Sequence, residues 1–346
     1  MNLKSRIHRL IHWEYWPMWA IYLPVMPFWF YYSLRARSFF FFSASNPGIK
    51  NGGMAMESKM DIYNLIPSQF IPKTFLVDGH QSIYALRQLL QNAGISYPLI
   101  VKPDIGMKAF AVCKIKNEEE LIDYASTIGE AFIVQELIVW PREVGVFYHR
   151  FPKEEKGKIT GIVEKEFLKV VGDGIHTIDA LINMEPRSAM RIKALQKLHG
   201  DHLQTILEPG EEFVLVPFGS HTRGAKFIDA SNHITAELEH LMDTICKPVS
   251  GFYFGRLDIR FDDMESLQRG KHFSVIEING AGSEPTHMYD PSHSLLFAWK
   301  EIINHWRILF AISRENRKVG HTNISFQEGM RMIADNKKRE AKLKLI

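Results

Sequence analysis

Short apolar runs and amphipathic segments alternate along the chain from Pro72 onward. Runs of apolar residues, bounded by proline, glycine and charged side chains, predict short strands. We expect these strands at 72–77, 98–103, 109–115 and 131–137. Residues 82–92 and 118–128 carry apolar side chains at helical spacing, and Gly94 closes the first of these predicted helices.

The remainder of this region predicts longer strands and a long final helix. Strands are expected at 144–151, 158–167, 211–219, 255–261 and 271–280. Helical spacing is found over Arg187–Leu203, Ile234–Cys246 and His293–Ser313. Several strands follow one another across short polar turns, so the pattern predicts a mixed α/β layout, an α+β fold with antiparallel strands.

The N-terminal segment has a different pattern. Trp16–Leu34 holds 19 residues without a charge, eight of them aromatic, and basic residues flank it on both sides. Pro17, Pro24 and Pro27 disrupt a regular spanning helix, and Trp and Tyr favour the headgroup region of a bilayer. We therefore expect residues 1–42 to be a membrane-associated helical segment bent into one leaflet. A single span and a buried aromatic helix are the alternatives.

Bulk composition excludes several other classes of protein. The 346 residues are 46% apolar and 23% charged, as in ordinary globular proteins. A net charge of +3 gives no electrostatic footprint for nucleic acid, so no nucleic-acid partner is expected. Cys113 and Cys246 provide neither a disulfide framework nor a zinc site, which fits a reducing compartment.

Two of the expected strands carry polar side chains on one face. Alternation places Arg256 and Asp258 on the same side of one strand, and Glu277 and Asn279 on the same side of the other. If the strands pair, Asp258, Glu277 and Asn279 form an oxygen-rich group that suits Mg²⁺, with Mn²⁺ as the alternative metal. Arg256 can then stabilise negative charge that develops on a reacting group.

Two earlier strand ends carry groups that suit a nucleotide. Lys102 ends an apolar strand, and the proline that follows confines its backbone to an extended form. An ammonium group at that position suits a phosphate, and Lys108 lies just beyond the next turn. Gln135 and Glu136 end another apolar strand, where polar and backbone groups can read the adenine edge. Glu143 follows as an acid suited to ribose hydroxyls.

This order of residues resembles the ATP-grasp superfamily, most nearly its D-alanine–D-alanine ligase-like carboxylate–amine ligases. The resemblance covers about residues 72–312, and 170–182 is also similar to the cyanophycin synthetase branch. It implies an ATP-grasp fold, in which two α/β subdomains clasp ATP. It further implies phosphate contacts from Lys102 and Lys108, and adenine and ribose contacts from Gln135, Glu136, the backbone of Leu137 and Glu143. By the same resemblance, Asp258, Glu277 and Asn279 hold Mg²⁺ and Arg256 stabilises the reacting carboxyl centre.

In that family ATP converts a carboxylate into an acyl phosphate, which an amine then attacks. The resemblance thus implies an ATP- and Mg²⁺-dependent ligase that forms a carbon–nitrogen bond. The usual N-terminal substrate domain is missing, so we expect a lipid-like or other small-molecule substrate at the membrane, with the catalytic domain on the cytoplasmic side. A phosphotransferase and a membrane-tethered ATP-binding module without catalysis are the alternatives, and a homodimer remains open.

Two loops hold further candidates for substrate or phosphate contact, which are His221, Arg223 and Lys226 in one and Gly282, Glu284 and His287 in the other. Glu57, Lys59 and Asp61 alternate with apolar or small residues, and this pattern fits a solvated face and a substrate role equally well. The expected organisation is a membrane-associated segment (1–42), a substrate or linker region (43–71), a small subdomain (72–135), a large subdomain (136–330) and a basic tail (331–346).

Overall fold

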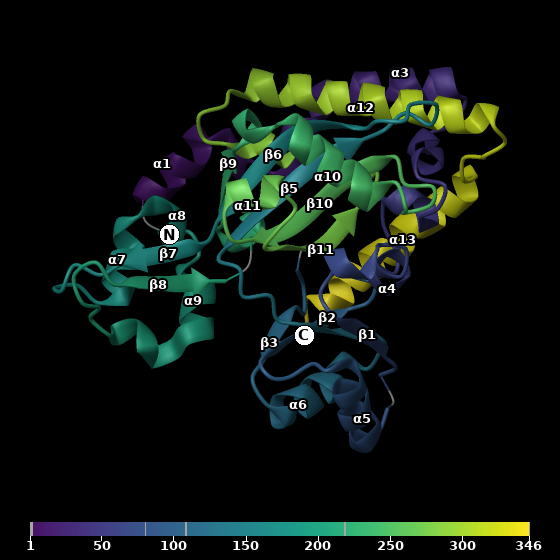
Figure 1. Ribbon diagram of the computed structural model, residues 1–346. Helices are drawn as coiled ribbons and strands as arrows, with labels where there is room; N and C mark the ends of the chain where they lie inside the picture. Colours follow the sequence, from purple (N-terminus) through teal and green to yellow (C-terminus); the bar gives the residue numbers. More distant parts are fainter. Residues whose placement is uncertain (1–2, 80, 108, 218, 346) are drawn as a thin grey trace.

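The computed structural model describes residues 3–79, 81–107, 109–217 and 219–345. Three antiparallel sheets organise the chain, with strand orders β1-β4-β2-β3, β11-β10-β5-β6-β9 and β7-β8. The four-stranded sheet lies below the five-stranded sheet in Figure 1, and the two-stranded sheet belongs to a lobe at the left. The predicted mixed α/β layout with antiparallel strands is therefore confirmed.

The small subdomain combines the four-stranded sheet with two helices on its lower side (Figure 1). Its elements are β1 (Thr74–Val77), α5 (Ile83–Ala93), β2 (Leu99–Pro103), β3 (Cys113–Ile115), α6 (Glu118–Ile128) and β4 (Phe132–Glu136). Ser82 and Asn117 cap the two helices by accepting hydrogen bonds from backbone amides three residues later. The strand expected over 109–115 is shorter, because positive φ angles at Ala109 and Ala111 interrupt the extended backbone.

The five-stranded sheet carries the large subdomain. Its elements are β5 (Arg142–His149), β6 (Lys158–Glu166), β9 (Lys226–Asp229), α10 (Ala236–Cys246), β10 (Phe254–Phe261), α11 (Met264–Gln268), β11 (Phe273–Asn279) and α12 (Leu295–Lys318). One face packs on α10 through a largely apolar core. The other face is apolar where Phe147 and Phe254 meet α12, but Glu143, Lys165 and Asp258 occupy it further along the strands.

The lobe has its own small core. It consists of β7 (Leu168–Val171), α7 (Ile178–Met184), α8 (Pro186–Ala189), α9 (Ile192–His199) and β8 (Glu212–Val216). The single helix expected over Arg187–Leu203 is in fact divided. Arg191, with ψ near 1°, interrupts the helical backbone, and Gly200, with φ 53° and ψ −132°, ends the second piece.

The N-terminal segment packs on the large subdomain. Its helices are α1 (Leu3–Ile11), α2 (Met18–Tyr22) and α3 (Met26–Ala36), and α3 runs beside α12 (Figure 1). The side that faces the domain is buried, including Ile21, Val25, Tyr32 and 40–42. The opposite side exposes a series of large apolar side chains. None of the helices in the described part of the chain is both long and apolar enough to cross a bilayer.

The chain returns to the small subdomain at two further places. Between the N-terminal segment and β1, α4 (Lys59–Tyr63) follows a run of short turns. At the other end, α13 (Phe326–Leu343) descends from the large subdomain (Figure 1). The basic tail expected from 331 onward belongs to this helix. It contacts the small subdomain, because Arg339 Nη2 and Lys342 Nζ both pair with Glu130, at 2.6 and 2.8 Å.

Candidate active site

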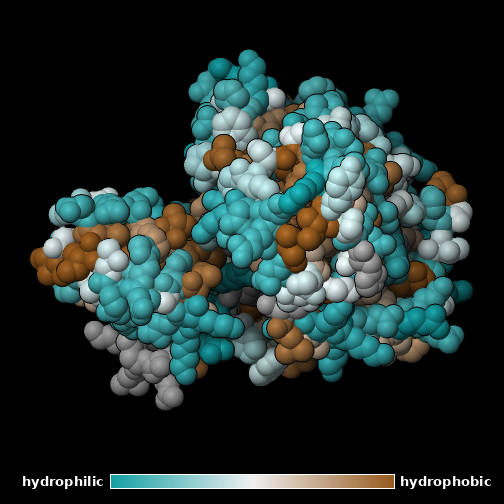
Figure 2. Space-filling model, turned by 90° about the horizontal axis from the view of Figure 1, so that it is seen from below, coloured by the Kyte–Doolittle hydropathy of each residue, from teal (hydrophilic) through white to brown (hydrophobic). Residues whose placement is uncertain are grey.

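A cavity of about 960 Å³ lies between the two larger sheets. Side chains from β2 and β4 line it on one side, and side chains from β5, β6, β10 and β11 line it on the other. The N-terminal segment and the lobe supply further lining residues. Figure 2 looks from the side of the small subdomain and shows the surface hollowed between the left-hand lobe and the rest of the molecule.

Pairing of β10 with β11 brings the four predicted wall residues onto one face. The register sets Arg256 opposite Asn279 and Asp258 opposite Glu277. Arg256 Nε and Nη2 donate to Asp258 Oδ1 and Oδ2, at 2.8 and 3.0 Å. The side-chain amide nitrogen of Asn279, Nδ2, lies 3.4 Å from Asp258 Oδ2. All four residues line the cavity, as the sequence analysis expected if the strands pair.

Lys165 on β6 is a wall residue that the sequence analysis did not identify. Its Nζ lies 2.8 Å from Glu143 Oε1 and 3.1 Å from Asp258 Oδ1, and only 4% of its side chain is exposed. Glu143 also lies 3.3 Å from Arg260 Nε. A signal was present in the sequence, because Lys165 follows Gly161 and Val163 at the alternate, buried positions of a strand.

The charges of this wall balance one another. Burial alone raises the pKa of Asp258, but Arg256 and Lys165 lower it to about 2. Burial lowers the pKa of Lys165, but Asp258 and Glu143 raise it above its ordinary value. Both groups are therefore ionised at neutral pH. The wall as a whole carries three cations and three carboxylates, Arg256, Lys165, Arg260, Glu143, Asp258 and Glu277, so it offers no net positive charge to a polyphosphate.

The oxygen donors of the wall fit Mg²⁺. Asp258, Glu277 and Asn279 offer carboxylate and amide oxygens, which are the ligands that Mg²⁺ prefers. Within the described ranges, no three His, Cys, Asp or Glu side chains are grouped so that they could hold a metal alone. These residues therefore suit an ion with few protein ligands, whose coordination shell is completed by phosphate oxygens. This is usual where Mg²⁺ binds together with a nucleotide.

A glycine on the middle strand makes room for this arrangement. Gly145 on β5 pairs with Asp258 on one side and with Val163 on the other. A Cβ atom at Gly145 would lie 2.9 Å from Arg256 Cδ and 3.1 Å from Asp258 Oδ1. Any other side chain there would displace the ion pair from its present position.

Lys102 faces the wall from the end of β2. Its Nζ donates to Tyr63 Oη at 2.7 Å, to Gln135 Oε1 at 3.0 Å and to the carbonyl oxygen of Ile276 at 3.2 Å. Burial lowers the pKa of Lys102 to about 8, although Glu277 and Asp258 raise it. All three acceptors are neutral, so the ammonium charge is not cancelled by direct contact with a carboxylate. A phosphate that contacts this ammonium group would replace one of the three acceptors, because a lysine ammonium has only three N–H donors.

The residues predicted to read adenine lie at the hinge between the subdomains. Gln135, Glu136 and Leu137 all line the cavity at and just beyond the end of β4. The Gln135 side chain is occupied, because its Oε1 accepts from Lys102 and its Nε2 donates to Thr74 Oγ1 at 2.9 Å. Gln135 thus positions Lys102, while Glu136, whose Oε2 accepts from Lys73 N at 3.3 Å, and Leu137 line the cavity.

The structure brings only some of the loop candidates to the cavity. Gly282, Glu284 and His221 line it. His287 lies beneath the wall, 3.3 Å from Glu301 Oε2. Arg223 Nη2 donates to the carbonyl oxygen of Ala109 at 2.6 Å. Lys226, the first residue of β9, lies 3.8 Å from Glu166. Neither Arg223 nor Lys226 is among the lining residues, and Lys108 lies outside the described residues.

The N-terminal segment forms part of the cavity wall, a role that the sequence analysis did not assign. Met18 lines the cavity, and Tyr22 Oη donates to Glu284 Oε1 at 2.5 Å. Glu14 is buried and accepts two hydrogen bonds from Arg187 Nη2, at 3.0 and 2.8 Å. His221 Nε2 lies 3.2 Å from the same carboxylate. These contacts connect the segment to the lobe and to the loop after β11.

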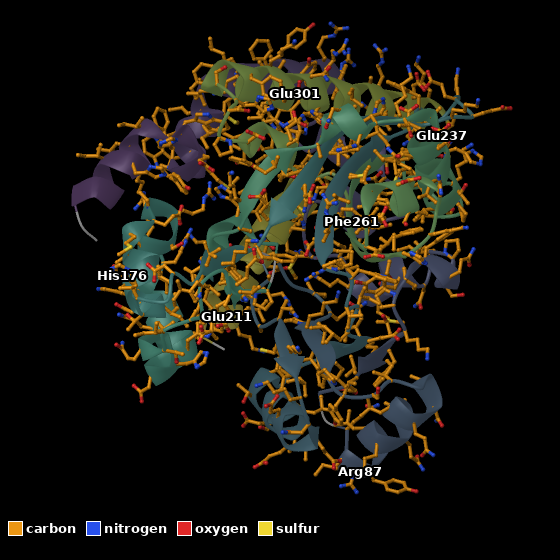
Figure 3. All side chains as sticks on the ribbon, turned by 60° about the vertical axis from the view of Figure 1, so that its left-hand side comes forward. Arg87, His176, Glu211, Glu237, Phe261 and Glu301 are labelled. Atoms are coloured by element: carbon orange, nitrogen blue, oxygen red, sulfur yellow. The ribbon has the colours of Figure 1, made fainter. Side chains whose placement is uncertain are left out.

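Other charged groups lie away from the cavity. Figure 3 shows His176 and Glu211 in the lobe and Arg87 at the far end of the small subdomain. His176 pairs with Asp173 at 2.6 Å on the surface, and Arg87 pairs with the Glu118 carboxylate. Exposed pairs of this kind contribute little to stability or to chemistry. The chemical groups of interest are therefore those of the cavity.

The chain is similar in structure to several solved enzymes. For the bifunctional glutathione synthetase of Pasteurella multocida, the TM-score is 0.40 at 15% identity, over 75% of this chain and 38% of that enzyme. For D-alanine–D-alanine ligase of Bacillus anthracis, it is 0.45 at 14% identity, over 78% and 70%. For the VanG D-Ala:D-Ser ligase of Enterococcus faecalis, it is 0.42 at 16% identity, over 74% and 62%. No protein-family model and no curated protein sequence matches the chain.

Proposed function

We propose that the protein is an ATP- and Mg²⁺-dependent ligase that activates a carboxylate as an acyl phosphate and joins it to an amine. One observation carries the proposal: Lys102 faces the Arg256, Asp258, Glu277 and Asn279 wall across a single cavity. The ordered resemblance of these residues to ATP-grasp ligases supports it. A protein that only bound ATP would have no evident use for Arg256, a cation suited to the charge of a reacting centre.

The residues divide the chemistry among themselves. Lys102, positioned by Gln135 and Tyr63, contacts the phosphates of ATP, while Glu136, Leu137 and Glu143 hold adenine and ribose. The substrate carboxylate attacks the terminal phosphorus and ADP leaves. The amine then attacks the acyl carbon and expels inorganic phosphate, with Arg256 stabilising the charge on the acyl oxygen. Mg²⁺ on Asp258, Glu277 and Asn279, or Mn²⁺ in its place, would offset the charge of the phosphate oxygens.

Product analysis tests the proposed reaction. The purified protein is given ATP, Mg²⁺ and a lipid extract, and ADP, inorganic phosphate and new amides are followed together. We expect all three products, and hydroxamate when hydroxylamine replaces the natural amine. ADP with a phosphorylated product but no free phosphate indicates the phosphotransferase instead, and ATP binding without turnover indicates a binding module. Asp258→Asn should abolish turnover, and full activity in that variant would exclude the assigned wall.

We also propose that the enzyme works on a lipid-like substrate at a membrane surface, with its cavity on the cytoplasmic side. The support is the outer side of the N-terminal segment, where Trp19, Leu23, Phe30 and Leu34 are 70, 64, 51 and 79% exposed. Exposed apolar surface of this extent is unusual for a soluble domain. A groove of about 710 Å³ between α3 and the start of α13 combines apolar walls with Arg37 and Arg317, which suits an anionic headgroup.

Vesicle binding tests this location. The full-length protein should sediment with vesicles of phosphatidylglycerol and phosphatidylcholine, and the double change Trp19→Ser and Leu34→Ser should weaken binding at least tenfold. Ile175→Ser with Leu198→Ser, which removes equally exposed side chains from the lobe, is the matched control. Equal binding of both double variants would exclude the N-terminal segment as the contact surface.

A further inference from the structure

One end of the cavity is built by residues that precede the small subdomain. The backbone of Gly52 and Gly53 pairs with the loop after β11, since Ala281 N donates to Gly52 O and Gly282 N to Gly53 O, both at 2.9 Å. The contact is close, because a Cβ atom on Gly282 would lie 2.6 Å from the carbonyl oxygen of Met54. This pairing fixes residues 52–57 against the metal-binding side of the cavity.

The same stretch continues to the small subdomain. Ser58 Oγ donates to Asp104 Oδ1 at 2.9 Å, and Lys59 Nζ donates to Gly106 O at 2.8 Å. Residues 52–59 therefore form a wall from one subdomain to the other. Along β10, Arg260 lies beside Glu143, and Asp258 and then Arg256 lie progressively nearer to residues 52–59. The wall thus lies at the end of the cavity away from the proposed ribose site.

Two carboxylates face this end. Glu284 Oε1 accepts hydrogen bonds from Tyr22 Oη at 2.5 Å and from Tyr289 Oη at 3.2 Å. Burial, together with Glu284, raises the pKa of both tyrosines well above the ordinary value, so they remain neutral donors. They orient the Glu284 carboxylate without neutralising it. Among the described residues, no Lys, Arg or His side chain lies within ion-pair distance of Glu284, although Glu284 is near enough to Arg256 to help raise the pKa of that guanidinium group.

Glu57 is the second carboxylate. It lines the cavity, and its Oε2 is enclosed without a hydrogen-bond partner among the described residues. Burial raises the pKa of Glu57, although its own backbone amide and Lys59 lower it. An enclosed carboxylate oxygen without a donor is costly. A ligand that brings a hydrogen-bond donor with a positive charge would remove that cost.

The side chains around these carboxylates are apolar. Met18 from α2 and Met54, Ala55 and Met56 from the wall line the same end of the cavity. Methionine side chains adapt to hydrocarbon chains of different shape. Met18 is also 52% exposed and directly precedes the exposed Trp19, so the apolar lining continues to the outer surface of the N-terminal segment.

We propose that this end of the cavity is the acceptor subsite and that it binds a primary amine carried on an apolar chain. Glu57 and Glu284 receive the ammonium group, and Met18, Met54 and Met56 contact the chain. The inference rests on the proposed ligase function and specifies the class of its nucleophile. It also explains the position of the N-terminal segment, which supplies Met18 of the apolar lining and the tyrosine that orients Glu284.

Binding of two simple probes tests the subsite. Octylamine and 1-octanol share a hydrocarbon chain, and only the amine is cationic at neutral pH. In the presence of Mg²⁺ and a non-hydrolysable ATP analogue, calorimetry should show octylamine binding at least tenfold more tightly than octanol. Glu57→Gln and Glu284→Gln should each remove most of this preference without weakening octanol. Glu155→Gln, at an exposed position, is the matched control and should retain the preference.

Several results would overturn the subsite. They are equal affinity for both probes in the unmodified protein, an unchanged preference in both glutamine variants, or a loss of Mg²⁺ affinity in Glu57→Gln in place of the lost preference. The proposed ligase function fails by a different measurement, which is the absence of ATP-analogue binding or of hydroxamate formation. Thermal unfolding of each variant separates a lost site from a lost fold.

Discussion

Glu143 on β5 and Asp258 on β10 contact the same ammonium group, Lys165 Nζ, at 2.8 and 3.1 Å. Neither carboxylate is exposed by more than 7% of its side chain. The contact connects the residue proposed for ribose to a residue proposed for the metal. Lys165 therefore contacts two parts of the proposed site at once, although it is on neither β10 nor β11.

Replacement of Lys165 tests this relationship. In Lys165→Met, two buried carboxylates lose a shared cation, and removing one partner of a buried pair costs about 3 kcal/mol. We expect that loss in urea unfolding, together with a fall of kcat of about a hundredfold or more, because the Asp258 carboxylate moves. Lys165→Arg keeps the charge and should recover part of both quantities. An unchanged kcat in Lys165→Met would contradict the positioning role.

The contrast between Lys165 and Asp258 shows what the sequence could predict. Asp258 and Glu277 lie on strands that are consecutive along the chain apart from one short helix, and alternation alone gives their common face. Lys165 joins them only because β5 lies between β6 and β10 in the sheet. Strand order across a sheet depends on long-range pairing, which local patterns do not specify.

The N-terminal segment illustrates the same limit. Its composition predicted a membrane-associated segment, with a buried aromatic helix as one alternative, and the structure shows exposed aromatic residues on one side. That the other side packs on α12 and lines the cavity could not be predicted, because the buried partners of Glu14 and Tyr22 lie more than 150 residues away. The position of His287, a candidate for substrate or phosphate contact, could not be predicted for a related reason. The short helical turn over 286–289 places it beneath the wall, next to Glu301 on α12.

Gly145 should tolerate no side chain. In Gly145→Ala, the new Cβ would lie 2.9 Å from both Arg256 Cδ and Val163 Cγ1, and such overpacking costs about 1–3 kcal/mol. The displaced Asp258 should also bind metal less well. We expect at least a tenfold weaker affinity for Mn²⁺, measured by electron paramagnetic resonance in the presence of an ATP analogue. Unchanged Mn²⁺ affinity in a folded variant would show that the contact is relieved elsewhere.

His305 should make the fold sensitive to mild acid. Its Nε2 lies 2.9 Å from Thr160 Oγ1 and its Nδ1 lies 2.8 Å from the Glu301 carbonyl oxygen. Burial lowers the pKa of His305 to about 4, although its contacts with Glu301 raise it. Between about pH 6.5 and 4 the unfolded chain therefore binds more protons at this residue, so its contribution favours unfolding as the pH falls.

The size of this effect follows from the shift in pKa. Between pH 7 and 4 the wild-type protein should lose about 3 kcal/mol more free energy of unfolding than His305→Gln, whose side chain cannot become charged. Urea unfolding at several pH values measures the difference. Burial also lowers the pKa of His149 to about 4, and because a charged His149 lowers the pKa of His305, the measured difference includes this interaction. Parallel pH profiles for the two proteins would contradict the prediction.

ATP binding should take up a proton at Lys102. In the free protein burial lowers the pKa of Lys102 to about 8, so near pH 8.5 most of the molecules carry a neutral amine. A bound polyphosphate favours the ammonium form and raises this pKa. Binding should then consume about 0.7 proton per ATP at pH 8.5 and much less at pH 7, in proportion to the neutral fraction.

Calorimetry of ATP binding in two buffers with different ionisation enthalpies gives this proton uptake directly. Lys102→Arg keeps a cation that stays protonated throughout, so its binding should release or consume no proton at pH 8.5. The ATP affinity of the wild-type protein should also fall as the pH rises through about 8, while that of the arginine variant stays level. Equal proton uptake in both proteins would show that another group titrates, and that Lys102 does not contact the phosphates.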